Sequence, residues 1–187
     1  MAQPTSTFLE ELMNAARGCF ALLVGNRQAS TWFDFSQRGL IGSLIAAVIA
    51  IGLAGFGPVL IGVPLPKGAA TQSIVINGVL FVAQAGTALL ALRQMGRQDG
   101  FVPYLVASNW VTLVSAVLLL LSTLLGPLGV AILALVVILA LATFINIGRF
   151  IVTLTPMQIG ILFVSQAVGV FLALAVVAII FVPPPAA

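Results

Sequence analysis

The stretch "FVPYLVASNWVTLVSAVLLLL", residues 101–121, decides the fold because it is apolar along its whole length and carries no charged side chain. A helix needs about 20 such residues to cross the hydrocarbon core of a bilayer. The segment nevertheless contains Ser108, Asn109 and Trp110 near its start, and Thr112 just beyond them. Polar side chains that faced lipid would keep unpaired hydrogen-bonding groups, so we expect these residues to face other helices.

Runs of the same kind occur five times in the 187 residues. The predicted spans are residues 39–63, 73–92, 101–125, 128–148 and 157–182. Each run is too long for a barrel strand, which alternates over about 9–11 residues. Only 6% of the chain is charged and 61% is hydrophobic, whereas soluble domains are about 25% charged. The sequence therefore predicts an all-α fold, an integral membrane bundle of five transmembrane helices.

Basic residues follow the positive-inside pattern, in which arginine and lysine gather in cytoplasmic loops. The arginines at one predicted side are Arg17, Arg27, Arg38, Arg93, Arg97 and Arg149. The other side has only Lys67. We therefore expect a cytoplasmic N-terminus and an external, periplasmic C-terminus. Since the basic residues form no cluster, binding to nucleic acid is not expected.

A short arm, residues 1–38, precedes the predicted transmembrane domain of residues 39–182, and residues 183–187 form a short external tail. Apolar residues at helical spacing predict an amphipathic helix from Thr7 to Val24 that lies on the cytoplasmic membrane surface. Thr7 and Glu10 have the form of a capping box, and Gly25 is placed to end the helix. Because acidic rather than basic residues come first, we expect no cleavable signal peptide.

The apolar face of this helix is predicted to contain Phe8, Leu12, Ala16, Cys19 and Leu23. Cys19 is interpreted as a small apolar residue on the buried side, with a regulatory thiol as the alternative.

Three aromatic residues, Trp32, Phe33 and Phe35, stand directly before the first span. Aromatic rings favour the headgroup region of a membrane. We interpret these three as an interfacial anchor, and a docking site for a partner is the alternative.

Amides and hydroxyls inside the spans are the candidate functional residues. They are Asn77, Gln84, Asn109, Gln166, Ser108, Thr112 and Ser165. Two interpretations are open. The groups either form an interhelical network that specifies which helix faces meet, or they line a polar cavity that holds a solute or a lipid headgroup. Interhelical hydrogen bonds in membranes contribute only about 0.6 kcal/mol on average, so a network would specify more than it stabilises.

Small residues recur every four positions on the first span, at Gly42, Ala46, Ala50 and Ala54. Such a ladder lets another helix approach closely. We expect an internal helix contact there, and a homodimer interface is the alternative.

Several chemistries lack their usual residues. The chain has no histidine and a single cysteine, so the common ligand sets for zinc, haem and iron–sulfur clusters are missing. A Ser-His or Cys-His nucleophile pair is missing as well. No charged residue lies deep in a span, where proton relays and ion pathways place them. We therefore expect no catalytic residues, no metal, no cofactor and no enzymatic activity.

The segments "FDFSQRGLIGSLIA" (residues 33–46) and "VASNW" (residues 106–110) resemble alphaproteobacterial membrane proteins of unassigned activity that are loosely similar to the Yip1 group of five-span proteins. The residues that carry this resemblance are Phe33, Asp34, Ser36, Gly39, Ser43, Asn109 and Trp110. The resemblance implies a bacterial inner-membrane protein that acts as an organiser or assembly partner. It does not extend to the trafficking role of eukaryotic Yip1 proteins, because their longer cytoplasmic region is reduced here to a short arm.

Two functions follow from these observations. The first is a non-enzymatic membrane protein that acts through contacts with lipids or other membrane proteins. The second is a small carrier or channel-like subunit that works as a homo-oligomer around an amide-lined site in the middle of the membrane. A polar cavity between the helices would favour the second function, and a dry, tightly packed centre the first.

Overall fold

The structure is a computed structural model that describes residues 8–125 and 128–181. This part of the chain is helical and contains no strand. The elements are α1 (Phe8–Leu23), η1 (Arg27–Trp32), α2 (Gln37–Leu60), α3 (Ala69–Gln94), η2 (Gln98–Gly100), α4 (Phe101–Thr123), α5 (Leu128–Asn146), the π-helical η3 (Ile147–Ile151) and α6 (Pro156–Phe181). Five of the described helices, α2 to α6, are long and apolar enough to cross a bilayer. The predicted all-α bundle is confirmed, and the chain is a multi-pass membrane protein.

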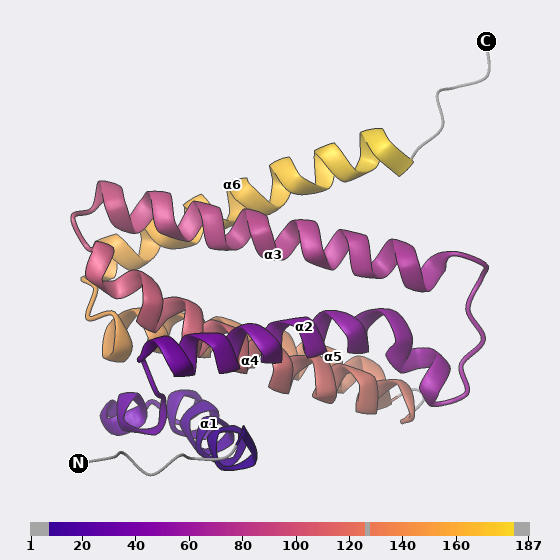
Figure 1. Cartoon of the computed structure of the whole chain (residues 1–187), viewed down its shortest axis with the longest axis horizontal. Coiled ribbons are helices and arrows are strands. Elements are labelled where there is room, and N and C mark those ends of the chain that lie inside the picture. The colour runs from indigo at the N-terminus through magenta and orange to yellow at the C-terminus, as the bar shows by residue number, and fades with distance from the viewer. Residues whose placement is uncertain (1–7, 126–127, 182–187) are drawn as a thin grey trace.

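The five long helices form an open row rather than a closed ring. Their order in space is α5, α4, α2, α3 and α6, with the closest packing between α2 and α4. Figure 1 shows α3 and α6 together on one side of the molecule and α2, α4 and α5 together on the other. Of their apolar windows, 39% is buried in α2 and 33% in the α4 span, against 11% in α3. The centre of the fold is therefore the α2–α4 pair.

The first helix lies across the bundle. In Figure 1 the axis of α1 is turned across the axes of the spans, near the end where α2 begins. It packs against α4 and α5, and η1 connects it to η3. An orientation across the spans is the one that an interfacial helix takes in a membrane.

The end of α1 agrees with the prediction made for Gly25. This residue has a positive φ of 70°, which glycine adopts without steric cost. The N–H of Asn26 donates to the carbonyl of Ala21 at 2.8 Å, and that of Gly25 donates to Leu22 at 3.1 Å. This is the hydrogen-bond pattern of a Schellman motif. Thr7, the expected first member of the capping box, and the expected tail 183–187 lie outside the described residues.

The apolar surface of α1 is divided between two faces, whereas the sequence indicated one. The residues buried against the rest of the protein are Ala15, Gly18, Cys19, Ala21 and Leu22. A second stripe, made by Leu9, Met13 and Phe20, is exposed. Helical spacing could not separate these faces, because apolar residues satisfy the same period whether they contact lipid or protein.

Candidate functional site

Asn109 joins the two central helices. Its Nδ2 atom donates to the Ser43 hydroxyl of α2 at 3.2 Å. Both residues are buried, with exposed fractions of 3% and 0%. Ser43 in turn donates to the carbonyl of Leu40 at 2.8 Å. The amide therefore finds its partner on another helix, and it sets the facing sides of α2 and α4.

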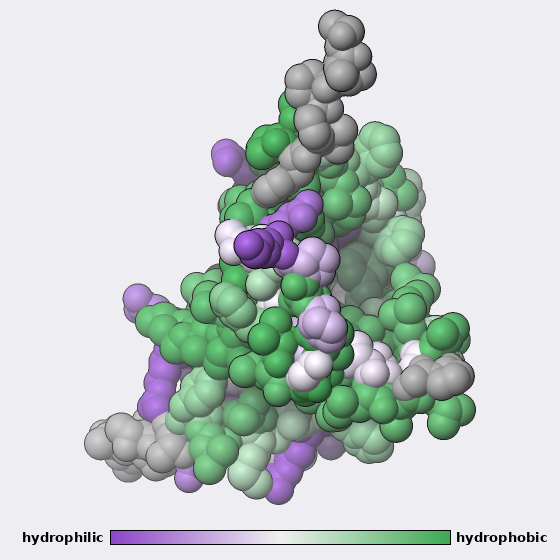
Figure 2. All heavy atoms as spheres, turned by 90° about the vertical axis from the view of Figure 1, so that its right-hand side faces the viewer, coloured by the Kyte–Doolittle hydropathy of each residue, from purple (hydrophilic) through white to green (hydrophobic). Residues whose placement is uncertain are grey.

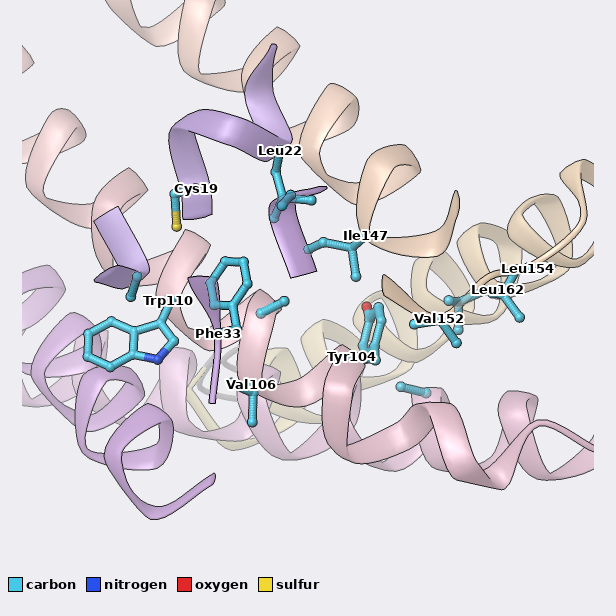
Figure 3. Packing of buried hydrophobic residues seen from close by; sticks show 14 of the residues in the cluster. Cys19, Leu22, Phe33, Tyr104, Val106, Trp110, Ile147, Val152, Leu154 and Leu162 are labelled. Carbon is cyan, nitrogen blue, oxygen red and sulfur yellow. The ribbon is translucent and has the colours of Figure 1, made fainter. Parts of the chain in front are cut away.

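Trp110, the next residue, contacts the first helix instead. Its side chain is 2% exposed, and its ring centroid lies 6.1 Å from that of Phe8. Figure 3 shows Trp110, Cys19 and Phe33 close together in the buried cluster. Two consecutive residues of α4 thus pack against two different helices.

A cavity of about 430 Å³ lies between α2, α3 and α4. Its size falls within the range of small-molecule pockets, about 300–1,000 Å³. It exists because α3 packs against α2 and α6 and makes few contacts with α4. Figure 2, viewed from the end where α2 is joined to α3, shows a hollow in the predominantly apolar surface. We call this cavity the α2–α3–α4 groove.

Polar side chains and small apolar side chains line the groove together. The polar ones are Asn77, Gln84, Ser108, Asn109, Thr112, Ser115 and Thr123, and the small apolar ones include Ala47, Ala50, Ala54, Ala85 and Ala116. None of the described lining residues is charged. The site can therefore offer hydrogen bonds and apolar contact to a ligand, but no ion pair.

Some of these polar groups are already paired within their own helices. Thr112 donates to the carbonyl of Ser108 at 2.8 Å, and Asn77 donates to Ser73 at 2.8 Å. The side-chain amide of Gln84 and the hydroxyl of Ser115 have no hydrogen-bond partner among residues 8–125 and 128–181. An amide or hydroxyl without a partner in an apolar environment costs about 1–3 kcal/mol. The Gln84 amide and the Ser115 hydroxyl are therefore the groups that can form hydrogen bonds with a ligand in the groove.

The structure brings five of the seven predicted cavity residues to this groove and places the other two elsewhere. Ser165 and Gln166 lie on α6 and do not line the groove. Gln166 donates through Nε2 to the backbone carbonyl of Gln84 at 2.9 Å. It therefore joins α6 to α3. Ser115, which the sequence did not include among the candidates, lies on the lining instead.

The predicted packing ladder of α2 serves contacts within the chain over most of its length. Gly42, Ala46 and Ala50 are buried, while Ala54 is exposed along the groove. Two further glycines allow α3 and α4 to approach α2 closely. A Cβ atom at Gly55 would lie 2.5 Å from Ile74 Cγ1 of α3.

Gly57 is in a similar position toward α4, since a Cβ atom there would lie 2.9 Å from Leu120 Cδ1. The four-residue spacing used in the sequence analysis excluded both Gly55 and Gly57.

The carboxylate of Glu11 occupies the space left by Gly42. A Cβ atom at Gly42 would lie 2.3 Å from Oε1 of Glu11. This oxygen is buried and has no hydrogen-bond partner within the described part of the chain. Burial raises the pKa of the Glu11 carboxyl above its ordinary value, Asp34 raises it further, and Arg38 opposes the change. The charged form is therefore the less favourable one in this position.

The aromatic residues before α2 do not act alike. Trp32 is 37% exposed and lies 5.5 Å below the guanidinium of Arg17, as suits an interfacial ring. Phe33 is only 7% exposed, because its ring packs against the bare backbone of Gly18. Its ring is stacked with that of Phe35 at 6.2 Å. Phe33 is thus part of the core rather than an exposed anchor.

The start of α2 explains other residues of the same segment. Ser36 caps the helix by accepting from the N–H of Gly39 at 3.4 Å. The Ser36 hydroxyl donates to Oδ2 of Asp34 at 2.9 Å. A Cβ atom at Gly39 would lie 1.9 Å from the Asp34 carbonyl oxygen, so only glycine fits. These residues have a local structural role.

Arg97 connects two loops at the end of the bundle where α2 begins. Its guanidinium donates to the carbonyls of Val152 and Thr153 and to the Thr153 hydroxyl. It also forms an ion pair with Asp99 at 3.5 Å. Thr153 has a φ of 57°, a conformation that is costly for a β-branched residue. No local sequence pattern relates Arg97 to Thr153, 56 residues away, so this contact could not be predicted from the sequence.

Asn146 fixes the end of α1. Its Nδ2 atom donates to the backbone carbonyl of Leu22 at 2.7 Å, one of the groups that a helix end leaves without an intrahelical partner. The π-helical turn η3 begins at the next residue. In Figure 3 the side chains of Leu22 and Ile147 face one another at this junction.

Cys19 lies in the buried cluster, as the sequence indicated. Burial raises the pKa of its thiol to about 12, which keeps the thiol protonated at neutral pH. Within the described ranges no three His, Cys, Asp or Glu residues are close enough to hold a metal ion.

The fold and the groove together define a multi-pass membrane protein with an uncharged, polar-lined site between three of its spans. Comparison of the chain with protein-family models, with curated proteins and with solved structures gives no match.

Proposed function

We propose that this chain is a non-enzymatic protein of the bacterial inner membrane that acts by holding lipid in the α2–α3–α4 groove. The observation that carries the proposal is the unpaired amide of Gln84 on the wall of a cavity of about 430 Å³. A lipid that entered this cavity would supply the missing partner and would cover the apolar lining. The proposal is the lipid-contact form of the first function inferred from the sequence.

The distribution of arginine supports a cytoplasmic N-terminus. All six arginines belong to α1, η1, the start of α2, the last turn of α3, the α3–α4 connection or η3, at the end of the bundle where α2 begins. Lys67 precedes α3 at the opposite end. The positive-inside rule then puts the C-terminus in the periplasm.

Copurification of lipid tests the proposal. The full chain is extracted into nanodiscs, and the bound lipid is identified by mass spectrometry. Ala85→Trp fills the groove, whereas Leu90→Trp puts the same ring on a surface of α3 that is 59% exposed. We expect Ala85→Trp to lose the bound lipid and Leu90→Trp to retain it. Equal lipid content in the wild type and Ala85→Trp would exclude the groove as the site.

The same experiment addresses the organiser role that the resemblance implies. A second membrane protein that copurified with this chain in a fixed ratio, in both tryptophan variants as well as in the wild type, would be the informative result. It would support a role as an assembly partner rather than as a lipid-binding protein.

A small oligomeric carrier is the second candidate, and the groove itself favours it. Polar groups follow the groove from Ser108 to Thr123 along α4, so a solute could move between them. Uptake of an uncharged solute into proteoliposomes, abolished by Ala85→Trp, would support the carrier. Absence of uptake with retained lipid binding would support the lipid-holding protein.

A further inference from the structure

We infer that the groove selects an uncharged amphiphile, a molecule with a hydrocarbon chain and a hydroxyl or amide group that hydrogen-bonds to Gln84. This inference rests on the proposed function and adds the chemical class of the ligand. Long-chain alcohols, monoacylglycerols and fatty amides have this chemistry.

The lining of the groove favours a neutral ligand. No lysine, arginine, aspartate or glutamate is among the described residues that line the groove. An ion transferred into an apolar site without a counter-ion is far more costly than a neutral polar group. The phosphate of a phospholipid and the carboxylate of a fatty acid are therefore disfavoured inside the groove.

The free polar groups of the groove can both donate and accept hydrogen bonds. The Gln84 amide has two N–H donors and a carbonyl acceptor, and the Ser115 hydroxyl has one donor and can also accept. Asn77 and Asn109 use their Nδ2 atoms in the chain's own hydrogen bonds, to Ser73 and Ser43. Both asparagines line the groove, and a side-chain carbonyl oxygen is an acceptor only. A hydroxyl or an amide group, which donates and accepts, complements this set.

The free polar groups of the groove lie deep within the membrane-spanning helices. The lining on α4 runs from Tyr104 to Thr123, about 28 Å at a rise of 1.5 Å per residue. Ser115 lies about 12 Å along α4 from the nearer helix end at Thr123, and Gln84 lies about 15 Å along α3 from the nearer end at Gln94. Both groups are far from the ends of their helices. The polar part of the ligand must therefore sit within the hydrocarbon region, which suits a small uncharged head.

Photolabelling of the full chain in nanodiscs tests the inference. The two probes are a diazirine-bearing hexadecanol and a diazirine-bearing hexadecanoic acid, at a pH where the acid is ionised. We expect the alcohol to label peptides of α2, α3 and α4, and the acid to label them much less, because an unpaired charge is costly in an apolar site. Unlabelled hexadecanol should compete with the labelling.

Gln84→Leu should reduce labelling by the alcohol several-fold. Gln166→Leu is the matched control, because it removes an amide of the neighbouring helix that lies outside the groove. If labelling by the alcohol is equal in Gln84→Leu and in the wild type, the assigned role of Gln84 is wrong.

The outcomes separate the ligand class from the proposed function. Labelling of the groove by the acid as strongly as by the alcohol would overturn the ligand class and leave lipid binding intact. Labelling of these peptides by neither probe would overturn both. If Gln84→Leu fails to fold, the comparison of the two probes on the wild type still decides between these results.

Discussion

Replacing Gly55 with alanine tests the close contact between α2 and α3, which sets the distance between these helices at one end of the groove. The added Cβ atom would lie 2.5 Å from Ile74 Cγ1 and 2.9 Å from the backbone carbonyl oxygen of Ala70. The oxygen belongs to the first turn of α3 and cannot move without the helix. Gly52, on the same helix, has no atom within 4 Å of the corresponding position, so Gly52→Ala is a matched control.

The size of the effect follows from two opposing terms. Alanine is a better helix former than glycine by up to about 1 kcal/mol, and this gain is common to both variants. Overpacking of a close contact costs about 1–3 kcal/mol, and only Gly55→Ala incurs it. The free energies of unfolding of the two variants should therefore differ by about 1–3 kcal/mol, with Gly52→Ala the more stable.

Reversible unfolding in lipid bicelles measures this difference directly. Because the helix-propensity gain cancels between the variants, the difference reports the α2–α3 contact alone. Gly55→Ala with the stability of Gly52→Ala would show that α3 does not approach α2 at this position, and the groove geometry would be wrong.

Three further perturbations test other contacts of the fold. Asn109→Leu should destabilise the folded protein by about 0.6 kcal/mol, the usual contribution of an interhelical hydrogen bond in a membrane. A double-mutant cycle with Ser43→Ala should return the same coupling energy. A coupling energy of zero would mean that the Asn109–Ser43 hydrogen bond is absent. Glu11 has a raised pKa, so its protonated form is favoured in the folded protein, and stability should fall as pH rises above the ordinary value of 4.5 through the raised value. Glu11→Gln should remove this slope in unfolding measurements, and an unchanged slope would assign it to another group. Arg97→Gln removes charged donors from two backbone carbonyls and should cost about 1.5–3 kcal/mol, with faster proteolysis next to Thr153; unaltered proteolysis would show that the loop holds without Arg97.

The membrane-spanning helices could be predicted from the sequence because a single physical requirement decides them. Uncharged length alone placed the second span at residues 73–92, and α3 occupies Ala69–Gln94. The differences lie at the ends, where caps and loop contacts decide. The first span was expected to begin at residue 39, but α2 begins at Gln37, because Ser36 is its cap.

The candidate site could be predicted only in part, since helical spacing shows which residues share a face but not which helix lies opposite. Asn77, Gln84 and Asn109, three of the candidates, line the groove. Gln166 has the same chemistry, yet it faces the far side of α3. The order of helices in the open row decides this, and it depends on contacts between residues distant in the sequence, which no local pattern contains.

Ser108, Asn109 and Trp110 have one more consequence. Successive residues of a helix point about 100° apart, and these three contact the groove, α2 and α1 in turn. Contacts on three sides of α4 therefore fix its rotation about its own axis. A rotation by one residue would displace all three of these side chains at once. A ligand that turned α4 even slightly would also shift Phe8 through Trp110, so occupancy in the membrane interior would be communicated mechanically to the surface helix.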